Sequence, residues 1–184
     1  FTMNGRESDY TWTTPYIDNS QVVIVKSGSS INKLADLSGK VVVVQADSSA
    51  LAAFTGEDAT EDNLALAKSF ASLQQVGDYN AAFMNLESGS VDAICMDMGV
   101  AKYELEARGI QFRMLSEQVS KEQYGIGFKP GNTELRDTVQ ETLYDMLADG
   151  TFGNIAKDWG LEESICLSAD NKVNDITADK KTSG

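Results

Sequence analysis

The sequence predicts an α/β protein built on a mostly parallel sheet. Residues 41–44 are four consecutive valines, an unbroken apolar run typical of a strand buried on both faces of a parallel sheet. A second apolar run at 91–96 resembles it, and a helix-like segment follows each run. Strands that alternate with helices are typical of βαβ units. The chain has 184 residues, enough for one generous domain or two small lobes.

The first half of the chain contains four further elements. The β-branched run at 22–26 predicts a strand. Residues 30–37 are expected to form a short helix capped by the first of them, Ser30. Ser48 is expected to cap a helix that extends to about Phe54, and the acidic stretch 56–63 is expected to be a surface loop.

A second strand and helix cycle follows. Asp78 is expected to cap a helix that ends at Gly89, because glycine often ends a helix by adopting a left-handed conformation. The strand at 91–96 comes next, then a helix at about 99–108 and a further strand at 112–115.

The remaining chain predicts two helices and a polar tail. Two glycines within 124–128 suit a segment that crosses between lobes. Asn132 or Thr133 is expected to cap a helix that extends to 149, and a shorter helix covers 151–159. The first of these helices carries an apolar stripe made of Leu135, Val139, Leu143 and Leu147. The composition from 168 to 184 predicts a weakly ordered tail.

Composition excludes several classes of function. The net charge of −13 argues against nucleic acid and anionic membranes as partners, since both attract Lys and Arg clusters. Histidine is absent, which removes Ser-His-Asp and Cys-His catalysis and most zinc sites. Carboxylates and lysines could still act as catalytic groups, but we expect no catalytic residue, no metal site and no cofactor. Cys95 and Cys166 are expected in different lobes, so a disulfide between them is not expected.

Four residues are candidates for ligand binding, and each has a simpler alternative. Arg6 can fork a carboxylate, or it is an ordinary surface residue. Ser48 and Ser49 follow a buried strand, where ligands collect in open parallel sheets, and an N-cap role is compatible with ligand contact. Asp97 also ends a strand, where it can bind an ammonium or cap the next helix, while Asp47 is expected to face solvent. Together these groups predict a receptor for a free α-amino acid.

Seven motifs occur along the chain in this order: TMNGRE (2–7), YTWTTPY (10–16), LADLSGKV (34–41), VQADSSA (44–50), LESGSVDAI (86–94), YGIGF (124–128) and LADGTFGNIAKDWG (147–160). In these motifs and their order, from its first residue to about residue 167, the chain resembles the amino-acid-binding solute-binding proteins of ABC importers.

This resemblance implies a periplasmic-binding-protein-like type II fold with one complete βαβ lobe, lobe 2, hinge strands and an incomplete lobe 1. Two such lobes close around the ligand. The implied organisation is a fragment of lobe 1 with the first hinge at 1–19, lobe 2 at 20–125, the second hinge and the C-terminal helices of lobe 1 at 126–167, and the polar tail at 168–184.

The resemblance also implies roles for the four candidate residues. Arg6 would bind the ligand α-carboxylate, Ser48 and Ser49 would add hydrogen-bond donors, and Asp97 would bind the α-ammonium. The implied function is to capture an amino acid outside the cytoplasm, in the periplasm or on the outer face of the cell membrane, and to deliver it to the membrane permease subunits. Two alternatives stay open: a sensor module of a membrane receptor, and a dehydratase built on the same fold.

The sequence departs from the family pattern at its start. Family members begin with roughly a half-lobe that precedes the first motif here, and the aromatic residues that select the ligand side chain usually belong to it. The apolar stripe on the helix at 133–149 would then lack part of its partner surface. We expect that exposure to favour self-association.

Overall fold

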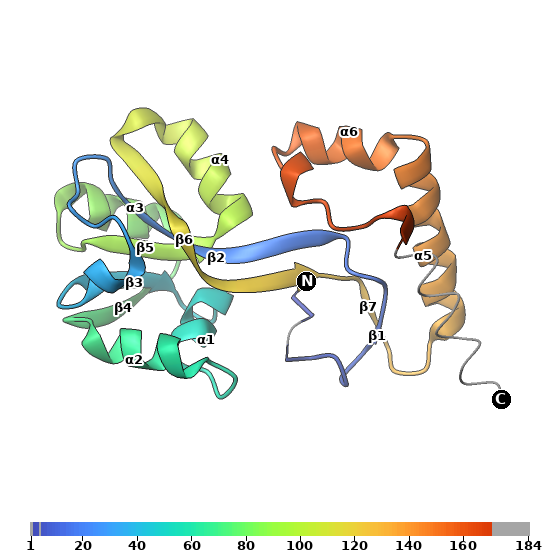
Figure 1. Cartoon of the computed structure of the whole chain (residues 1–184), viewed down its shortest axis with the longest axis horizontal. Coiled ribbons are helices and arrows are strands. Elements are labelled where there is room, and N and C mark those ends of the chain that lie inside the picture. The colour runs from blue at the N-terminus through green and yellow to red at the C-terminus, as the bar shows by residue number, and fades with distance from the viewer. Residues whose placement is uncertain (1, 4, 171–184) are drawn as a thin grey trace. The chain divides into compact units, whose positions relative to one another are not determined.

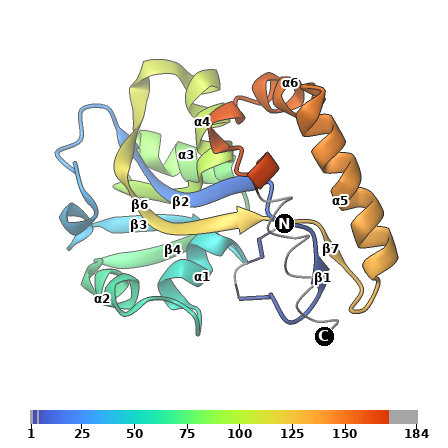
Figure 2. The same cartoon turned by 45° about the vertical axis from the view of Figure 1, so that its right-hand side comes forward.

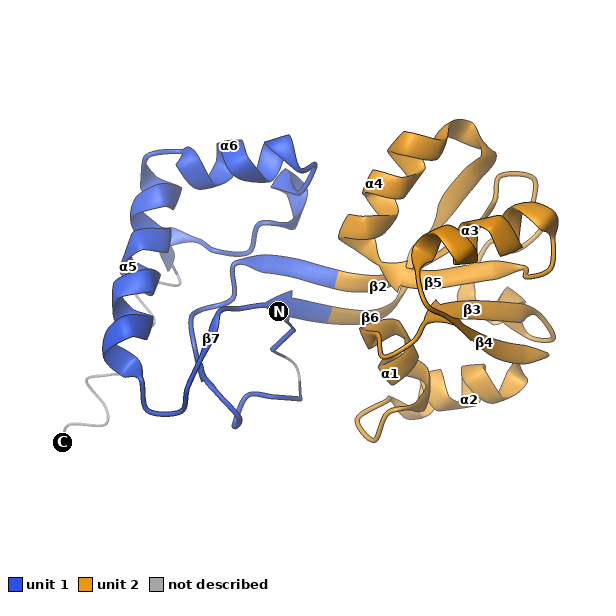
Figure 3. Cartoon of the chain, turned by 180° about the vertical axis from the view of Figure 1, so that it is seen from behind, with its two compact units in different colours: residues 1–19, 122–184 blue, residues 20–121 orange. Residues whose placement is uncertain are grey.

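The computed structural model describes residues 2–3 and 5–170 (Figure 1). The chain divides into two compact units (Figure 3): unit 1 comprises Phe1–Asn19 and Glu122–Gly184, and unit 2 comprises Ser20–Lys121. The chain passes from one unit to the other within two strands, β2 (Ile17–Lys26) and β6 (Phe112–Tyr124). The predicted polar tail lies, from residue 171 onward, outside the described residues.

Unit 2 is built on a five-stranded sheet in the order β4-β3-β5-β2-β6, of which Figure 2 labels β4, β3, β2 and β6. The central strand β3 (Val41–Gln45) is parallel to both β4 (Ser72–Val76) and β5 (Ala93–Asp97). By contrast, β2 is antiparallel to β5. The sheet is therefore mixed rather than mostly parallel, because β2 enters unit 2 at the edge where β5 ends and runs in the opposite direction.

Helices cover both faces of this sheet (Figure 1). On one face, α1 (Ser49–Thr55) and α2 (Glu61–Ser69) pack on a core that includes Val23 and Val44. On the other, α3 (Tyr79–Ser88) and α4 (Met98–Arg108) pack on a core that includes Phe83. The valine run of β3 is fully buried between these two cores at 42–44, as expected for a central strand.

The predicted ends of two helices are confirmed. The Ser48 hydroxyl accepts a hydrogen bond from the Leu51 N–H at 3.1 Å, and the Asp78 carboxylate accepts one from the Ala81 N–H at 2.9 Å. Gly89 ends α3 with a φ of 84°, a conformation that costs a residue with a Cβ but not glycine. The predicted helix at about 99–108 also corresponds to α4.

Three elements of unit 2 were not predicted: α2, β4 and a short 3-10 helix, Gly109–Gln111. Residues 61–63 were expected in a loop, but they begin α2, whose N-cap Thr60 accepts the Asn63 N–H at 3.2 Å. Two acidic residues occupy the first turn of α2, where their negative charge interacts favourably with the helix dipole. Strand β4 is polar and half exposed because it lies at the sheet edge.

The predicted helix with Ser30 as its N-cap is wrong. The segment forms one short 3-10 helix, Leu34–Leu37. The Asp36 carboxylate turns back and accepts the N–H groups of Asn32 at 2.9 Å and Lys33 at 3.2 Å. These backbone donors, that of Asn32 first, lower the pKa of Asp36. A nearby acceptor therefore organises this turn in place of Ser30.

Unit 1 contains a short antiparallel pair, β1 (Thr11–Trp12) with β7 (Gly127–Phe128), and the helices α5 (Thr133–Ala148) and α6 (Thr151–Asp158). A short 3-10 helix, Glu162–Ser164, follows α6. The hydrophobic core of the unit joins both helices to the start of β2 and to the segment after the 3-10 helix: its buried members are Ile17, Leu143, Tyr144, Phe152 and Leu167.

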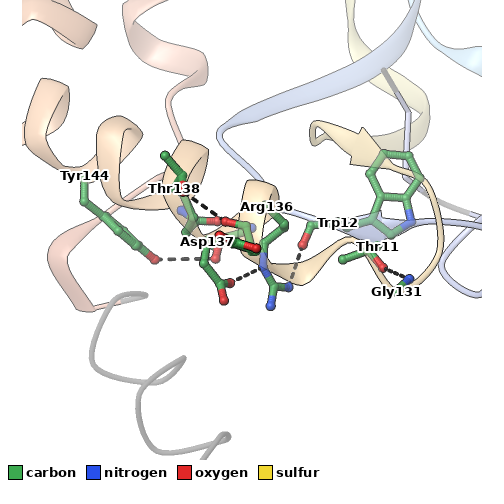
Figure 4. A network of polar contacts seen from close by, with 10 residues as sticks. Thr11, Trp12, Gly131, Arg136, Asp137, Thr138 and Tyr144 are labelled. Atoms are coloured by element: carbon green, nitrogen blue, oxygen red, sulfur yellow. Dashed lines mark hydrogen bonds and ion pairs between the residues drawn. The ribbon is translucent and has the colours of Figure 1, made fainter.

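The apolar stripe of α5 is buried only toward its C-terminal end. Leu143 is 9% exposed and Leu147 packs against the unit 1 core, whereas Leu135 is 50% exposed. The helix begins at Thr133, and the preceding Asn132 makes no side-chain capping bond. Polar contacts fix its first half instead (Figure 4): the Arg136 Nη1 donates to the Trp12 carbonyl at 3.0 Å.

Candidate functional site

The carboxyl ends of β3, β4 and β5 form one edge of the unit 2 sheet, because these three strands are parallel. Val43 pairs with Ile94, and continuing that register places Asp97 level with Ala46. Ser48 and Ser49 therefore follow the end of the strand next to the one that Asp97 closes. The structure brings these three predicted residues to one edge of one unit.

These residues also share one face of the sheet. Ala93 and Cys95 of β5 belong to the core under α1 and α2, and Asp97 has the same parity along the strand. The first turn of α1 contributes Ala50 to this core, so Ser48 and Ser49 enter from the same side. A carboxylate and a pair of hydroxyls consequently lie at the rim of a single hydrophobic core.

A buried glutamine holds the Asp97 carboxylate. Gln21 is the residue of β2 that pairs with Asp97 across the antiparallel ladder. Its Nε2 donates to the Asp97 Oδ1 at 2.7 Å, and Gln21 itself is 0% exposed. Asp97 occupies the N-cap position of α4 but makes no side-chain capping bond. The cap alternative for this side chain is therefore not observed.

The Ser48–Ser49 turn carries a local conformational cost. Asp47 has a φ of 54°, the one described non-glycine residue in the left-handed region. Such residues are uncommon and often occur at ligand sites. The Ser48 hydroxyl accepts the Leu51 N–H and also donates to the Gln45 carbonyl at 2.7 Å. Ser48 therefore acts as an N-cap, as the simpler alternative predicted, whereas the half-buried Ser49 side chain makes no hydrogen bond within the described part of the chain.

Tyr79, at the start of α3, lies next to Asp97. Burial raises the pKa of the Tyr79 phenol to about 12, and the nearby Asp97 and Cys95 side chains add to this rise. A hydrogen bond with the Asp97 backbone acts in the opposite direction. Since Asp47, Asp78 and Asp97 follow the ends of three neighbouring strands, this edge favours a cationic group.

Arg6 belongs to unit 1, where it lies on an exposed turn. Its backbone is well fixed: the Arg6 carbonyl accepts the Trp12 indole N–H at 3.0 Å, and the Arg6 N–H donates to the Met3 carbonyl at 2.9 Å. Trp12 is 8% exposed, and its backbone carbonyl accepts a hydrogen bond from Arg136 of α5 (Figure 4). The Arg6 turn is thus anchored to the longest helix of unit 1 through one tryptophan.

Gly125 permits a close approach beneath the same turn. A Cβ at this position would lie 2.5 Å from the Met3 sulfur and 3.2 Å from the Trp12 ring. The glycine therefore lets the segment after β6 pack against the chain that carries Arg6, a packing role that the sequence interpretation as a crossing segment did not include.

Other kinds of site were sought in the described residues. No group of three or more Cys, Asp or Glu side chains there is arranged to hold a metal ion. No described helix is long and apolar enough to cross a membrane. Cys95 and Cys166 carry thiols rather than a disulfide, and burial, together with Asp18, raises the pKa of Cys166 to about 12.

The model of the bacterial extracellular solute-binding proteins, family 3, matches residues 1–162. The chain belongs to this family. Among the curated family 3 relatives, arginine-binding protein 1 of an Escherichia coli K12 ABC transporter is 28% identical to this chain, over 84% of this chain and 60% of that protein. The chain is 26% identical to the glutamine-binding protein of a Bacillus subtilis ABC transporter, over 86% of this chain and 54% of that protein.

The fold of this family 3 protein also matches solved structures. A substrate-binding protein of an ABC uptake transporter from Streptococcus pneumoniae, with bound histidine, superposes with a TM-score of 0.77 at 25% identity, over 91% of this chain and 68% of that one. An ancestral arginine-binding protein bound to glutamine superposes with a TM-score of 0.68 at 30% identity, over 85% of this chain and 66% of that one. The predicted fold class, periplasmic-binding-protein-like, is confirmed. The chain spans 54–60% of the length of the two curated relatives.

Sequence reasoning missed Gln21 and Tyr79. Gln21 carried only a weak signal, since it stands where the polar run 18–20 of the strand gives way to the apolar run 22–25. Tyr79 carried none, because a tyrosine at the first position of a helix is ordinary.

Proposed function

We propose that this chain is the substrate-binding part of an amino-acid ABC transporter that works outside the cytoplasm, captures a free amino acid and delivers it to the permease. One observation carries the proposal: in a chain that matches a solute-binding family over residues 1–162, a carboxylate held by a buried amide lies at the sheet edge beside Ser48 and Ser49. The relatives named above are binding proteins, so we assign no reaction to it.

The proposed roles follow from charge. Asp97 receives the ligand α-ammonium, which supplies up to three N–H donors to carboxylate and neutral acceptors. Arg6 pairs with the α-carboxylate through its fork of N–H groups. Ser49 adds a hydroxyl donor, and Ser48 contributes through its backbone N–H because its hydroxyl already caps α1. Arg6 belongs to unit 1, and the other three residues belong to unit 2.

Calorimetry with each of the twenty amino acids tests this function. We expect at least one to bind, and we expect its affinity to fall about 10- to 100-fold in Asp97→Asn, since a charged hydrogen bond is worth roughly 1.5–3 kcal/mol. Asp62→Asn is the matched control, because Asp62 is an exposed acid in the first turn of α2.

Two ligand analogues separate the roles of the charged groups. Agmatine lacks the carboxylate of arginine, and N-acetyl-arginine lacks its ammonium. Because the proposal requires both the α-carboxylate and the α-ammonium, we expect the chain to bind neither analogue. Tight binding of either analogue, or an absence of binding by all twenty amino acids, contradicts the proposal.

A further inference from the structure

Gln21 is placed unusually for a glutamine. It follows two buried polar residues of β2, Asn19 and Ser20, and precedes four apolar ones, 22–25, and it is the most deeply buried of these three polar residues, at 0% exposed. Its Nε2 donates to Asp97 at 2.7 Å, while its Oε1 is buried without a hydrogen-bond partner. One half of the side-chain amide is therefore used and the other half is left unsatisfied.

An arrangement of this kind does not favour stability. A buried acceptor without a partner loses its hydrogen bonds to water and forms none to replace them. An apolar side chain at position 21 would remove this cost, and the partly exposed Asp97 carboxylate could bond to water in place of the Gln21 N–H. Packing and stability alone therefore favour an apolar residue at position 21, as at the four positions that follow it, 22–25. The glutamine needs another explanation, and the group it contacts supplies one.

We propose that Gln21 is a positioning residue for amino-acid capture: its buried amide fixes the Asp97 carboxylate in the orientation that receives the ligand ammonium. The inference rests on the proposed function and adds to it a residue that does not touch the ligand. Gln21 and Asp97 are direct partners across two adjacent strands, so the amide is held by the ladder itself. A site group is most effective when residues behind it lock its conformation.

The arrangement also explains why Asp97 does not cap α4. A carboxylate free to rotate at an N-cap position would turn toward the first N–H groups of the helix. The Gln21 N–H instead holds Oδ1 on the β2 side. The proposed role of Gln21 is therefore to keep the Asp97 carboxylate from capping α4, the helix that follows it.

Gln21→Met tests the proposal, with L-arginine and L-glutamine as probes and with thermal unfolding measured in parallel. Methionine keeps the length and removes both amide atoms. We expect affinity to fall about 10-fold while the unfolding temperature stays the same or rises. In the Asp97→Asn background we expect Gln21→Met to change affinity less than 2-fold, because residues that act through one another are not additive.

Gln140→Met is the matched control. Gln140 is also buried, with an unpartnered Nε2, but its Oε1 accepts the Thr14 backbone N–H within unit 1. We expect this variant to lower the unfolding temperature, because it leaves the Thr14 N–H without that partner, and to keep affinity within 2-fold. The pair separates a positioning role from the general effect of removing a buried glutamine.

Nuclear magnetic resonance of the unsubstituted chain provides a test that needs no Gln21 variant. We expect the Gln21 side-chain amide resonances to shift on addition of the bound amino acid and to move in Asp97→Asn. The inference is overturned if those resonances are unmoved in Asp97→Asn, or if Gln21→Met binds as tightly as the parent chain. An unsubstituted chain that binds none of the twenty amino acids overturns the proposed function itself.

Discussion

The Asp97 side chain shows how far local sequence determines the role of one residue. Its position at the end of a buried strand was predictable from the apolar run before it, and so was its place before a helix. Its hydrogen-bond partner was not, because Gln21 lies 76 positions away and reaches it only through the register of two strands. The lack of a capping bond from Asp97 to α4 was therefore not predictable from any local pattern.

Tyr79 makes stability depend on pH in the alkaline range. Its pKa is about 12 in the folded protein and about 10 in an unfolded chain. The folded state thus keeps the proton more tightly, so this contribution to stability is fully present below pH 10 and is lost as pH rises toward 12. We expect Tyr79→Phe to lose less stability than the parent between pH 8 and pH 11, measured by urea unfolding.

Two comparisons make this measurement specific. The pKa of Cys166 is also raised to about 12, so the experiment is best done in a Cys166→Ser background. Tyr103→Phe is the control, since Tyr103 is 66% exposed. An equal loss of stability in Tyr79→Phe and Tyr103→Phe would count against the assignment of the shift to Tyr79.

The elements that sequence predicted best are those with both a cap and a buried face. Helix α3 has Asp78 at its start, Gly89 at its end and Phe83 in its buried face. Helix α2 was missed because its first turn is acidic and its strongest signal, Thr60, lies in a polar stretch. Strand β4 was missed because an edge strand need not be apolar, and only its pairing with β3 defines it.

The packing of α3 on the sheet gives a stability prediction at the scale of an element. Phe83 is 0% exposed, contacts the Phe112 ring edge-on at 5.2 Å between centroids, and lies under the Arg108 guanidinium. We expect Phe83→Ala to lower the free energy of unfolding by about 3–5 kcal/mol, the usual cost of a large aromatic cavity. Urea unfolding measures it.

The neighbouring residue provides the control for this substitution. Met84 lies next to Phe83 on the same helix but is 67% exposed, so Met84→Ala should stay within about 0.5 kcal/mol of the parent. Both variants keep the helix propensity high, because alanine is the best helix former. A loss of similar size at both positions would mean that α3 is not held by its buried face.

For the molecule as a whole, composition and motif order were more informative than any single residue. The order of the family motifs indicated a solute-binding protein, and the family match over residues 1–162 confirms it. The antiparallel direction of β2 was not predicted, because strand periodicity carries no information on direction. The compact units divide the chain inside β2 and β6, at 19–20 and 121–122, whereas the organisation implied by the resemblance divides it at 19–20 and 125–126.

Charge and exposed apolar surface act in opposite directions on self-association. Unit 1 exposes Leu135 at 50%, Ile155 at 47% and Trp159 at 73%, and such groups favour association when they gather on one surface. The net charge of −13 opposes association. Salt screens this repulsion at distances beyond roughly 10 Å at 0.1 M and beyond about 3 Å at 1 M. We expect sedimentation velocity to show association that grows with protein concentration and with added sodium chloride.

The double variant Leu135→Gln with Trp159→Gln tests which surface is responsible. It leaves the net charge unchanged and removes apolar area from α5 and from the residue after α6, so we expect the salt-dependent association to fall. Met84→Gln with Ile110→Gln is the control in unit 2, because these residues are 67% and 94% exposed. If the unit 2 pair reduces association and the unit 1 pair does not, the apolar surface of unit 1 is not the cause.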